Sequence, residues 1–352
     1  MWLPAQAVEV SGLYEAELSV TSQGRAERKE VIRAALLQVL IKVSGNTNVA
    51  LSAGVPQILK RSNQFLQQYR YRNANNLANS KAGTRFNRQY LWVRFDNVSL
   101  NKAMRNIGLA TWGRSRPATL AWIALERGGK RELLNSSSSL SKVILQQAKR
   151  RGIPLGLPRL DLEDQRKISV SDVLAGFQGP ILQASQRYSS EAVLVGRLRQ
   201  LANNRWQGRW TLNHAGQESN WTEEGDFDAV ISFGVDGVTS SLASKYARIT
   251  DNVAGELKVL VTDILTLQDY ARSDQFLAGL DGVIGVEPER IETQSVIFKV
   301  KLRGDHQSLL NAIQLSSQPI FSVVDPPSLA VVNTPSTNTI ATTPSLTFKL
   351  IP

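Results

Sequence analysis

Glu191–Ala247 reads EAVLVGRLRQ at 191–200, RWQGRWTLN at 205–213, QESNWT at 217–222 and VDGVTSSLASKYA at 235–247. The first segment has the pattern of an apolar strand, and the next two have the pattern of strands rich in tryptophan. The last segment has the periodicity of an amphipathic helix. A β-meander closed by such a helix buries one face of its sheet. The stretch therefore predicts a core of the fold rather than a reaction centre.

Three tryptophans mark this meander, at Trp206, Trp210 and Trp221. Trp206 and Trp210 are four residues apart, so they share one face of a strand. Large aromatic side chains on facing strands favour cross-strand packing, which we predict here. The alternative is an aromatic cage for a ligand.

Length and composition limit the class of protein. A chain of 352 residues predicts two or three domains, and its composition is that of a globular protein. No run approaches eighteen apolar residues, so the sequence predicts no membrane-spanning helix. Cysteine is absent, which excludes disulfides, thiolate catalysis, cysteine-ligated metal sites and a lipoprotein anchor.

The positive charge is concentrated at one end of the chain. Residues 1–116 hold 17 Lys or Arg against 6 Asp or Glu, whereas residues 117–352 hold 24 against 24. The whole net charge of +11 therefore belongs to the N-terminal part. Such an excess predicts an anionic partner or surface.

The first seven residues, MWLPAQA, are apolar and end in the small-x-small pattern Ala5-Gln6-Ala7 that signal peptidase reads. We interpret residues 1–7 as the remnant of a secretory signal, which predicts a periplasmic protein. The alternative is an ordinary N-terminus, which would leave the protein cytoplasmic.

Residues 8–116 predict a basic α+β module. Residues from Val8 to Val20 alternate between apolar and polar, with a change of phase near Gly12 that is typical of a bulge. Ala26–Val43 predicts an amphipathic helix that is stopped by Ser44-Gly45-Asn46. The remaining elements are a helix at Val55–Gln68, strands at Tyr69–Arg72 and Arg85–Phe95, and a helix at Val98–Gly108.

Residues 117–252 predict an α/β module that contains the tryptophan-rich meander. Ala118–Leu125 is almost continuously apolar, as in a strand covered on both faces. A helix at Leu140–Arg151 and the apolar segment Ile153–Leu157 complete a β-α-β unit with parallel strands. Two short helices, Val170–Gly176 and Pro180–Tyr188, lead into the meander.

Residues 253–325 predict a ferredoxin-like module with the order β-α-β-β-α-β. Its elements are strands at Leu257–Leu265, Val283–Glu289, Ser295–Leu302 and Phe321–Val324, with helices at Gln268–Gly279 and His306–Ser316. Residues 326–352 are rich in Pro, Ser and Thr and predict a flexible tail, in which Leu346–Leu350 adds an edge strand. The fold class is therefore α+β, with three small α/β modules and mixed sheets.

Three segments carry a resemblance to a known family. They are Val8–Gly45, with its strand and its helix ending in LLQVLIKVSG; AVLVGR at 192–197 with the three tryptophans; and Asp236–Ala247. With these segments the chain resembles domain-of-unknown-function family 2066, an uncharacterised family of exported Gram-negative envelope proteins. The resemblance implies that the protein is located in the envelope and shares the fold of that family. It implies no reaction.

The residue types that carry most catalysis are sparse. His214, in the hairpin turn NHAG at 213–216, and His306, after a predicted helix cap at Asp305, are interpreted as surface residues. The acidic clusters Asp161–Asp164 and Glu223–Asp228 are interpreted as solvated loops, although paired acids also serve glycoside hydrolysis or cation binding. No glycine-rich nucleotide motif is present. The sequence predicts no cofactor and no metal site.

The strongest candidate for a binding surface is a pair of basic and aromatic strands. Aromatic rings interleaved with guanidinium groups suit stacking on bases or sugars and pairing with phosphates. The alternative is a sheet face on which arginine stems cover the rings as part of the packing. The candidate residues for binding an anionic partner are Arg70, Arg72, Arg88, Tyr90, Trp92 and Arg94.

These observations predict a non-enzymatic periplasmic binding protein that acts as an assembly or accessory factor of the Gram-negative envelope. Its expected partner is an envelope protein or an anionic envelope component: peptidoglycan, lipopolysaccharide or lipid headgroups. Two alternatives stay open. One is a protein that binds nucleic acid or another polyanion, and the other is a carboxylate-dependent hydrolase with a cleft lined by acids of raised pKa.

Overall fold

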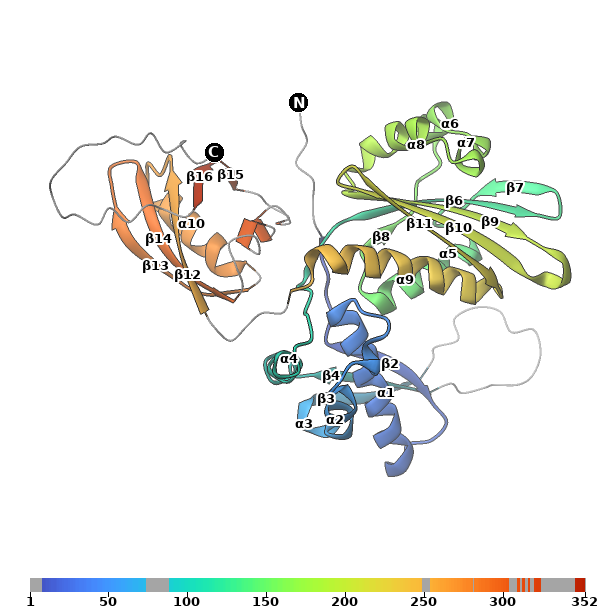
Figure 1. Cartoon of the computed structure of the whole chain (residues 1–352), viewed down its shortest axis with the longest axis horizontal. Helices are drawn as coiled ribbons and strands as arrows, with labels where there is room; N and C mark the ends of the chain where they lie inside the picture. The colour runs from blue at the N-terminus through green and yellow to red at the C-terminus, as the bar shows by residue number, and fades with distance from the viewer. Residues whose placement is uncertain are drawn as a thin grey trace. The chain divides into compact units, whose positions relative to one another are not determined.

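The computed structural model describes residues 8–73, 89–248, 254–280, 282–303, 309–310, 312–313, 316, 320–323 and 346–351. The chain divides into two compact units, Val8–Ala247 and Arg248–Pro352. Both contain helices and mixed sheets, so the predicted α+β class is confirmed (Figure 1). The predicted signal remnant, residues 1–7, lies outside the described residues.

The first part of the larger unit is a three-stranded antiparallel sheet with a long helix on one face. Helix α1 buries the predicted stripe, including Ile32, Leu36 and Val39, against the apolar face of this sheet. The sheet order is β2-β4-β3. The elements are β1 (Val8–Glu9), β2 (Glu15–Val20), α1 (Arg25–Ser44), η1 (Val49–Leu51), α2 (Val55–Lys60), α3 (Ser62–Phe65), β3 (Leu66–Asn73), β4 (Gln89–Phe95) and α4 (Asn97–Asn106).

Two predictions for this part were wrong. The strand expected from Val8 to Val20 has no bulge at Gly12, because Gly12 has a φ of 67° and divides the segment into β1 and β2, which belong to different sheets. The helix expected at Val55–Gln68 is broken at Arg61 and ends at Phe65, where β3 begins. Residues Leu66–Gln68 therefore extend the sheet instead of the helix.

The second part of the larger unit is a six-stranded sheet with helices on both faces (Figure 1). Its order is β11-β10-β9-β6-β7, and β8 also pairs with β6. The elements are β5 (Ser115–Arg116), which pairs with β1, β6 (Thr119–Arg127), β7 (Lys130–Leu133), α5 (Ser139–Arg151), β8 (Leu155–Gly156), α6 (Leu162–Lys167), α7 (Val170–Ala175), α8 (Gln178–Ser185), η2 (Gln186–Tyr188), β9 (Ala192–Gln200), η3 (Ala202–Asn204), β10 (Trp206–His214), β11 (Gln217–Gly225) and α9 (Phe227–Tyr246).

Strand β6 is buried along Thr119–Leu125, as its apolar run predicts. One face of β6 joins the core under α5 and α9, and the other joins a smaller core under α6, α7 and α8. Strands β6 and β8 are parallel and are connected through α5, which confirms the predicted β-α-β unit. The sheet therefore has two covered faces over the first half of β6 and β9.

The tryptophans of the meander are packing residues, as predicted. Trp206 and Trp210 are buried in the core, and Trp210 lies directly opposite Trp221 in the β10–β11 register. Helix α9 approaches these rings closely because it has glycine at Gly234 and Gly237, where a Cβ would overlap the indoles of Trp210 and Trp221 respectively. The motif Gly234-Val-Asp-Gly237 thus serves helix–sheet contact.

A buried arginine joins the two parts of the larger unit. Arg116 has no exposed surface, and its guanidinium lies 4.2 Å from the centre of the Trp112 ring. It donates hydrogen bonds to the carbonyl oxygens of Lys42, at the end of α1, and of Arg151 and Gly152, at the end of α5. Because helix C-termini carry partial negative charge and unpaired carbonyls, a cation at this point stabilises both ends.

The smaller unit contains a five-stranded sheet with the order β13-β14-β12-β16-β15. Its elements are β12 (Ala254–Thr262), α10 (Leu267–Gly279), β13 (Val283–Ile291), β14 (Ser295–Arg303), β15 (Phe321–Val323) and β16 (Leu346–Leu350). The four predicted strands and the first helix form, and the predicted second helix lies largely outside the described residues. The edge strand expected at Leu346–Leu350 is instead β16, which lies between β12 and β15 and buries Phe348.

Within the described residues, no helix combines the length and apolar character needed to cross a membrane.

Candidate functional site

Five of the six residues predicted to bind an anionic partner lie on one face of the β2-β4-β3 sheet. Tyr90, Trp92 and Arg94 alternate along β4, and the strand register places Arg72 opposite Tyr90 and Arg70 opposite Trp92. This face is opposite the one that packs on α1. Arg88 lies outside the described residues.

Trp92 is covered by its neighbours. Its side chain is only 7% exposed, and the guanidinium groups of Arg70, Arg72 and Arg94 lie 4.4, 5.4 and 5.3 Å from the centre of its ring. Cations over an aromatic face attract its electron-rich surface, and the arginine stems exclude water from it. Trp92 therefore presents no open face on which a base or sugar can stack. The arrangement matches the alternative in which arginine stems cover the ring.

Two of these arginines are also paired with carboxylates of β2. Arg94 donates from Nε (2.9 Å) and Nη2 (2.6 Å) to Oε1 of Glu15, and the Trp92 indole donates to Oε2 of the same carboxylate at 3.2 Å. Arg72 donates to Glu17 at 3.3 Å. The charge on this face is therefore partly neutralised within the sheet.

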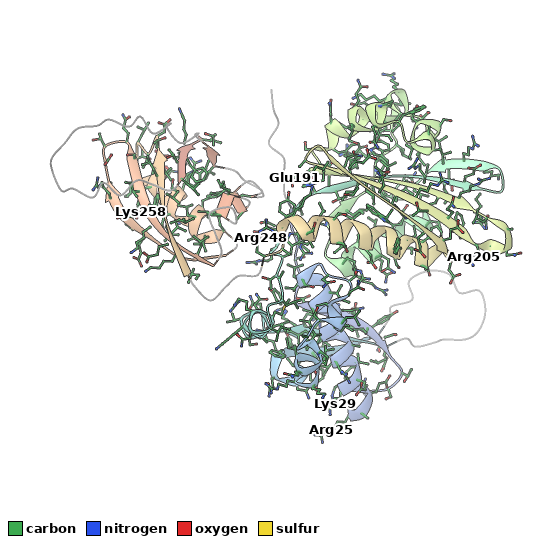
Figure 2. All side chains as sticks on the ribbon, viewed as in Figure 1. Arg25, Lys29, Glu191, Arg205, Arg248 and Lys258 are labelled. Carbon is green, nitrogen blue, oxygen red and sulfur yellow. The ribbon has the colours of Figure 1, made fainter. Side chains whose placement is uncertain are left out.

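A different set of cations in the same part of the chain has no such partners. Arg25, Lys29 and Arg33, which we call the cationic stripe, follow one another at intervals of four residues on α1, and all three are exposed. Among the described residues, none of the three forms an ion pair with a carboxylate. Figure 2 shows Arg25 and Lys29 on the first turns of α1, at the end that points away from the six-stranded sheet, which we call the central sheet.

One of the two acidic residues on α1, Glu27, is held away from the stripe; the other, Glu30, is exposed and forms no ion pair among the described residues. Its two carboxylate oxygens accept hydrogen bonds from the backbone and hydroxyl groups of Thr21 and Ser22. These bonds, with the Ser22 hydroxyl contributing most, lower the pKa of Glu27 to about 2. Glu27 thus closes the turn before α1 and does not pair with the stripe. Arg28, beside the stripe, lies over the Tyr69 ring at 5.5 Å.

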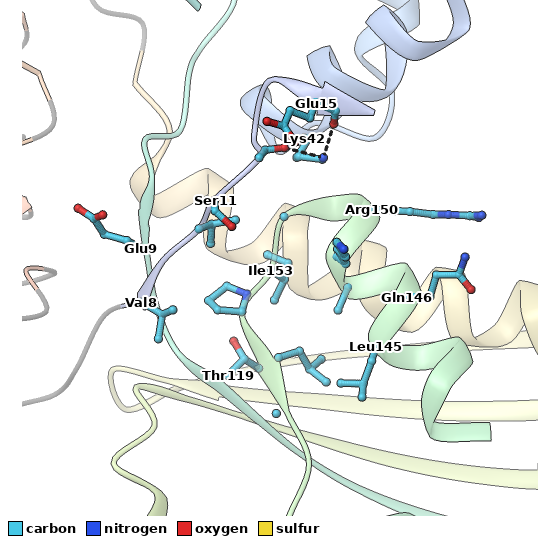
Figure 3. A pocket seen from close by; sticks show the side chains of 18 of the residues that line it. Val8, Glu9, Ser11, Glu15, Lys42, Thr119, Leu145, Gln146, Arg150 and Ile153 are labelled. Carbon is cyan, nitrogen blue, oxygen red and sulfur yellow. Dashed lines mark hydrogen bonds between the residues drawn. The ribbon is translucent and has the colours of Figure 1, made fainter. Parts of the chain in front are cut away.

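A cleft of about 990 Å³ lies between the two parts of the larger unit. Figure 3 shows Glu15 and Lys42 on one side of it and Leu145, Gln146 and Ile153 on the other. The Nζ of Lys42 donates to the carbonyl oxygens of Gly12 (3.1 Å) and Glu15 (2.8 Å). Burial, reinforced by the charge of Arg116, lowers the pKa of Lys42 to about 8.

The lining of this cleft is mixed in charge. Its basic residues are Lys42, Arg72, Lys149 and Arg150, and its acidic residues are Glu9, Glu15 and Glu17. Lys42 is already bonded to main-chain carbonyls, and Glu15 and Glu17 are already paired with arginines. The cleft is therefore large enough for a ligand but is not strongly biased towards an anion or a cation.

The first acidic cluster is structural. Asp161–Asp164 was expected in a polar loop, but it forms the start of α6: Asp161 accepts from the backbone N–H of Asp164, and Asp164 is fully buried. Arg187 donates to Asp161 at 2.6 Å and to Asp164 at 2.9 Å. The hydrogen bond from Arg187 is the main reason that the pKa of Asp161 is lowered. A hydrolase would need a raised pKa on one acid, so this pairing argues against that role.

The second acidic cluster, Glu223–Asp228, spans the end of β11 and the start of α9. Glu224 accepts a hydrogen bond of 2.5 Å from the amide of Gln207 on the neighbouring strand. The two described pockets are not lined by this cluster.

The prediction that His214 is a surface residue was wrong. His214 is the last residue of β10, it is only 7% exposed, and its Nε2 hydrogen bonds with the Tyr246 hydroxyl at 2.9 Å. Burial, together with the nearby charge of Lys245, lowers the pKa of His214 to about 4. The side chain is therefore a neutral part of the packing at ordinary pH. His306 lies outside the described residues.

Over the described part of the chain, no group of three or more His, Asp or Glu side chains is arranged to hold a metal ion.

The family comparison corrects the resemblance inferred from the sequence. A domain of unknown function (DUF8605) matches residues 7–113, which is the basic N-terminal part of the chain. The expected family, domain-of-unknown-function family 2066, was therefore wrong. The matching domain has no described activity. No curated protein matches the chain.

Two solved structures are distantly similar. One is a competence-damaged protein (CinA) superfamily protein from Enterobacter cloacae, with 14% identity and a TM-score of 0.21, covering 49% of this chain and 98% of that one. The other is an uncharacterized protein with 11% identity and a TM-score of 0.16, covering 37% of this chain and 93% of that one. Similarity at this level carries no information about function.

Proposed function

We propose that this protein is a non-catalytic binding factor that holds an anionic partner through the cationic stripe of α1. The observation that carries the proposal is that Arg25, Lys29 and Arg33 are exposed, regularly spaced and without a carboxylate partner among the described residues. The surrounding module is also the part of the chain that contains the whole net positive charge.

The stripe is unfavourable for the isolated helix. Like charges four residues apart destabilise a helix by about 0.2–0.5 kcal/mol per pair, and the stripe contains two such pairs. Cations near a helix N-terminus also oppose the helix dipole, at a cost of about 0.3–1 kcal/mol each. Arg25 lies in the first turn of α1, where this second effect is largest, and Lys29 lies in the second turn. A negatively charged partner on the stripe reverses both effects.

The geometry favours an extended anionic surface as the partner. Helical residues rise about 1.5 Å each, so the three cations span about 12 Å along the exposed side of α1. They do not line either described pocket, which argues against a small enclosed ligand. The burial of Trp92 removes the stacking surface expected for single-stranded nucleic acid. Repeated charges on a surface, such as lipid headgroups or lipopolysaccharide, fit a linear row of cations.

The proposal extends to an envelope role. The pattern Ala5-Gln6-Ala7 supports export to the periplasm, where anionic lipid headgroups, lipopolysaccharide and peptidoglycan are available partners. In this role the protein acts as an assembly or accessory factor. The structural use of Asp161 and Asp164 supports binding rather than hydrolysis.

The test is co-sedimentation with vesicles containing phosphatidylglycerol, compared with vesicles of phosphatidylcholine alone and with duplex DNA. The test variant carries Arg25→Gln, Lys29→Gln and Arg33→Gln. The control variant carries Lys60→Gln, Arg61→Gln and Lys102→Gln, which removes the same charge from exposed positions of the same module.

Each basic residue near an anionic membrane contributes about 1 kcal/mol, so loss of the stripe should weaken binding to the anionic vesicles about 100-fold. The control variant should bind nearly as well as the unmodified protein. Equal losses in both variants would show that net charge alone is responsible and would contradict the proposal. Binding to DNA but not to vesicles would favour the nucleic-acid alternative.

A further inference from the structure

A second group of unpaired cations lies on the central sheet, in the second half of β9 and the first half of β10. Arg197 and Arg199 on β9 and Arg209 on β10 line a pocket of about 400 Å³ next to α7. Arg131 and Glu126 also line this pocket, which we call the arginine pocket. Its volume is within the range of small-ligand sites. It lies in a different part of the unit from the cationic stripe, so an inference about it does not depend on the proposed function.

The register of the strands brings two of these arginines together. Arg209 lies directly opposite Arg197 in the β9–β10 ladder. Like charges at directly opposite positions of an antiparallel pair are destabilising. Arg199 is two residues from Arg197, so strand alternation puts it on the same face. Three cations are therefore collected on one small area of sheet.

The carboxylates near the pocket already have partners, although Glu126 lines the pocket opposite Arg199 in the β6–β9 register. Glu126 accepts from Arg131 at 3.4 Å, and Glu224 accepts from the amide of Gln207. Over the described part of the chain, Arg197, Arg199 and Arg209 form no ion pair with any acidic residue. The lining of the arginine pocket holds four arginines and one glutamate, so its positive charge is only partly balanced from within the protein.

One donor in the pocket is both buried and unused. The Nε of Arg197 is inaccessible to solvent and has no hydrogen-bond partner among the described residues. A buried donor without a partner keeps its full desolvation penalty. The guanidinium itself packs against Gly176 at the end of α7, where an added Cβ would lie 2.8 Å from Nη1. The position of the guanidinium is therefore restricted by close packing against the end of α7.

The pocket lies at the margin of the covering helices, where Ser171, Leu174 and Ala175 of α7 line one side of it. Helices α6, α7 and α8 cover Trp122, Val193 and Val195, in the first half of their strands. Arg197 and Arg199 follow on β9, and Figure 2 shows Arg205, in the turn after β9, at the end of the sheet beyond these helices. The apolar part of this face is therefore covered, whereas the arginines are left accessible at its edge.

We propose that the arginine pocket binds a small oxyanion ligand with two or more negative charges, held by Arg197, Arg199 and Arg209. Guanidinium groups pair with phosphate and carboxylate oxygens through two parallel hydrogen bonds, and such charge-assisted bonds are stronger than neutral ones. A doubly charged ligand between Arg197 and Arg209 converts their repulsion into two attractions. The shared chemistry is that of phosphate and carboxylate groups, and the experiment separates these two sources.

The experiment is isothermal titration of the full-length protein with pyrophosphate and, separately, with citrate. The test variants are Arg199→Gln and Arg209→Gln, at two exposed positions where loss of charge leaves the core intact. The control is Arg127→Gln. Arg127 is on β6 next to Glu126 of the pocket, but strand alternation points its side chain to the opposite face.

The unmodified protein should bind at least one of the two anions. Each test variant should bind that anion with a Kd about tenfold higher or more, whereas the Kd of the control variant should stay within about twofold of the unmodified protein's. Tighter binding of pyrophosphate assigns a phosphate-bearing ligand, and tighter binding of citrate assigns a carboxylate ligand. Arg209→Gln should also raise the Tm of the unliganded protein, because it removes the repulsion with Arg197. The proposal is overturned if neither anion binds at millimolar concentration, or if the test variants and the control bind alike.

Discussion

Nη2 of Arg116 donates a hydrogen bond of 2.8 Å to the main-chain carbonyl oxygen of Lys42, and both residues are buried. The bond connects the short strand β5 with the end of α1, 74 residues earlier in the chain. Further bonds from the same guanidinium reach the carbonyls of Arg151 and Gly152 at the end of α5. A single cation therefore links the basic N-terminal part with the central sheet.

Arg116→Met should lower the free energy of unfolding by about 3 kcal/mol or more, because several buried carbonyls lose a charged donor at once. Chemical denaturation measures this change. Arg150→Met, at an exposed position in the last turn of α5, should lower the free energy of unfolding by less than about 0.5 kcal/mol. Similar losses of stability for the two variants would show that the hydrogen bonds of Arg116 do not hold the basic N-terminal part to the central sheet.

Gly234→Ala and Gly237→Ala should each destabilise the protein by about 1–3 kcal/mol, because the new methyl group overlaps an indole ring. In an unobstructed helix the same change stabilises by about 1 kcal/mol, so the sign itself is informative. Gly179→Ala is the control, since a Cβ at Gly179 in α8 meets no atom within 4 Å. Combining Gly237→Ala with Trp221→Leu should recover part of the loss, and a double-mutant cycle measures that coupling.

Glu191→Gln should stabilise the protein at pH 8 and leave it unchanged at pH 4. Burial raises the pKa of Glu191 to about 7 from the model-compound value of 4.5, and its Oε1 has no hydrogen-bond partner among the described residues. A group whose pKa is raised on folding loses stability as the pH rises from about 4.5 through 7, since the unfolded chain ionises first. The gain at pH 8 should be about 1–2 kcal/mol, because solvent at this half-buried site screens part of the penalty.

The free energy of unfolding of the unmodified protein and of Glu191→Gln, measured at pH 4 and at pH 8, separates the pH dependence of Glu191 from that of His214. The lowered pKa of His214, about 4, has the opposite effect: stability is lost as the pH falls from about 6.5 towards 4, because the unfolded chain takes up the proton. A benefit of Glu191→Gln that is the same at pH 4 and pH 8 would contradict ionisation as its cause.

Arg25→Glu should raise the free energy of unfolding by about 0.5–1.5 kcal/mol while it weakens binding to anionic vesicles. The change replaces a cation at the start of α1 with an anion that favours the dipole and attracts Lys29. Thermal unfolding and vesicle co-sedimentation measure the two effects on one variant. Lys102→Glu, in the middle of α4, should alter neither by a comparable amount. A stripe variant that gains stability and keeps its binding would separate the stripe from the function.

Several elements could be predicted from the sequence because they depend on local periodicity. The apolar residues spaced at helical intervals from Ile32 to Val43 predict the buried face of α1. The continuous apolar run of β6 predicts a strand covered on both sides. The arginines of β9 and β10 were not singled out from the sequence, because their meeting depends on strand register.

The sequence by itself determined the helix and strand periodicities, the α+β class and the concentration of positive charge before residue 117, since each depends on neighbours along the chain. Only the tertiary structure decided which charges remain unpaired. It placed Glu15 against Arg94, buried His214 under Tyr246 and inserted β16 between β12 and β15. The physical reason is that pairing and burial depend on contacts between residues distant in sequence. The periodicity of a single segment contains no information about those contacts.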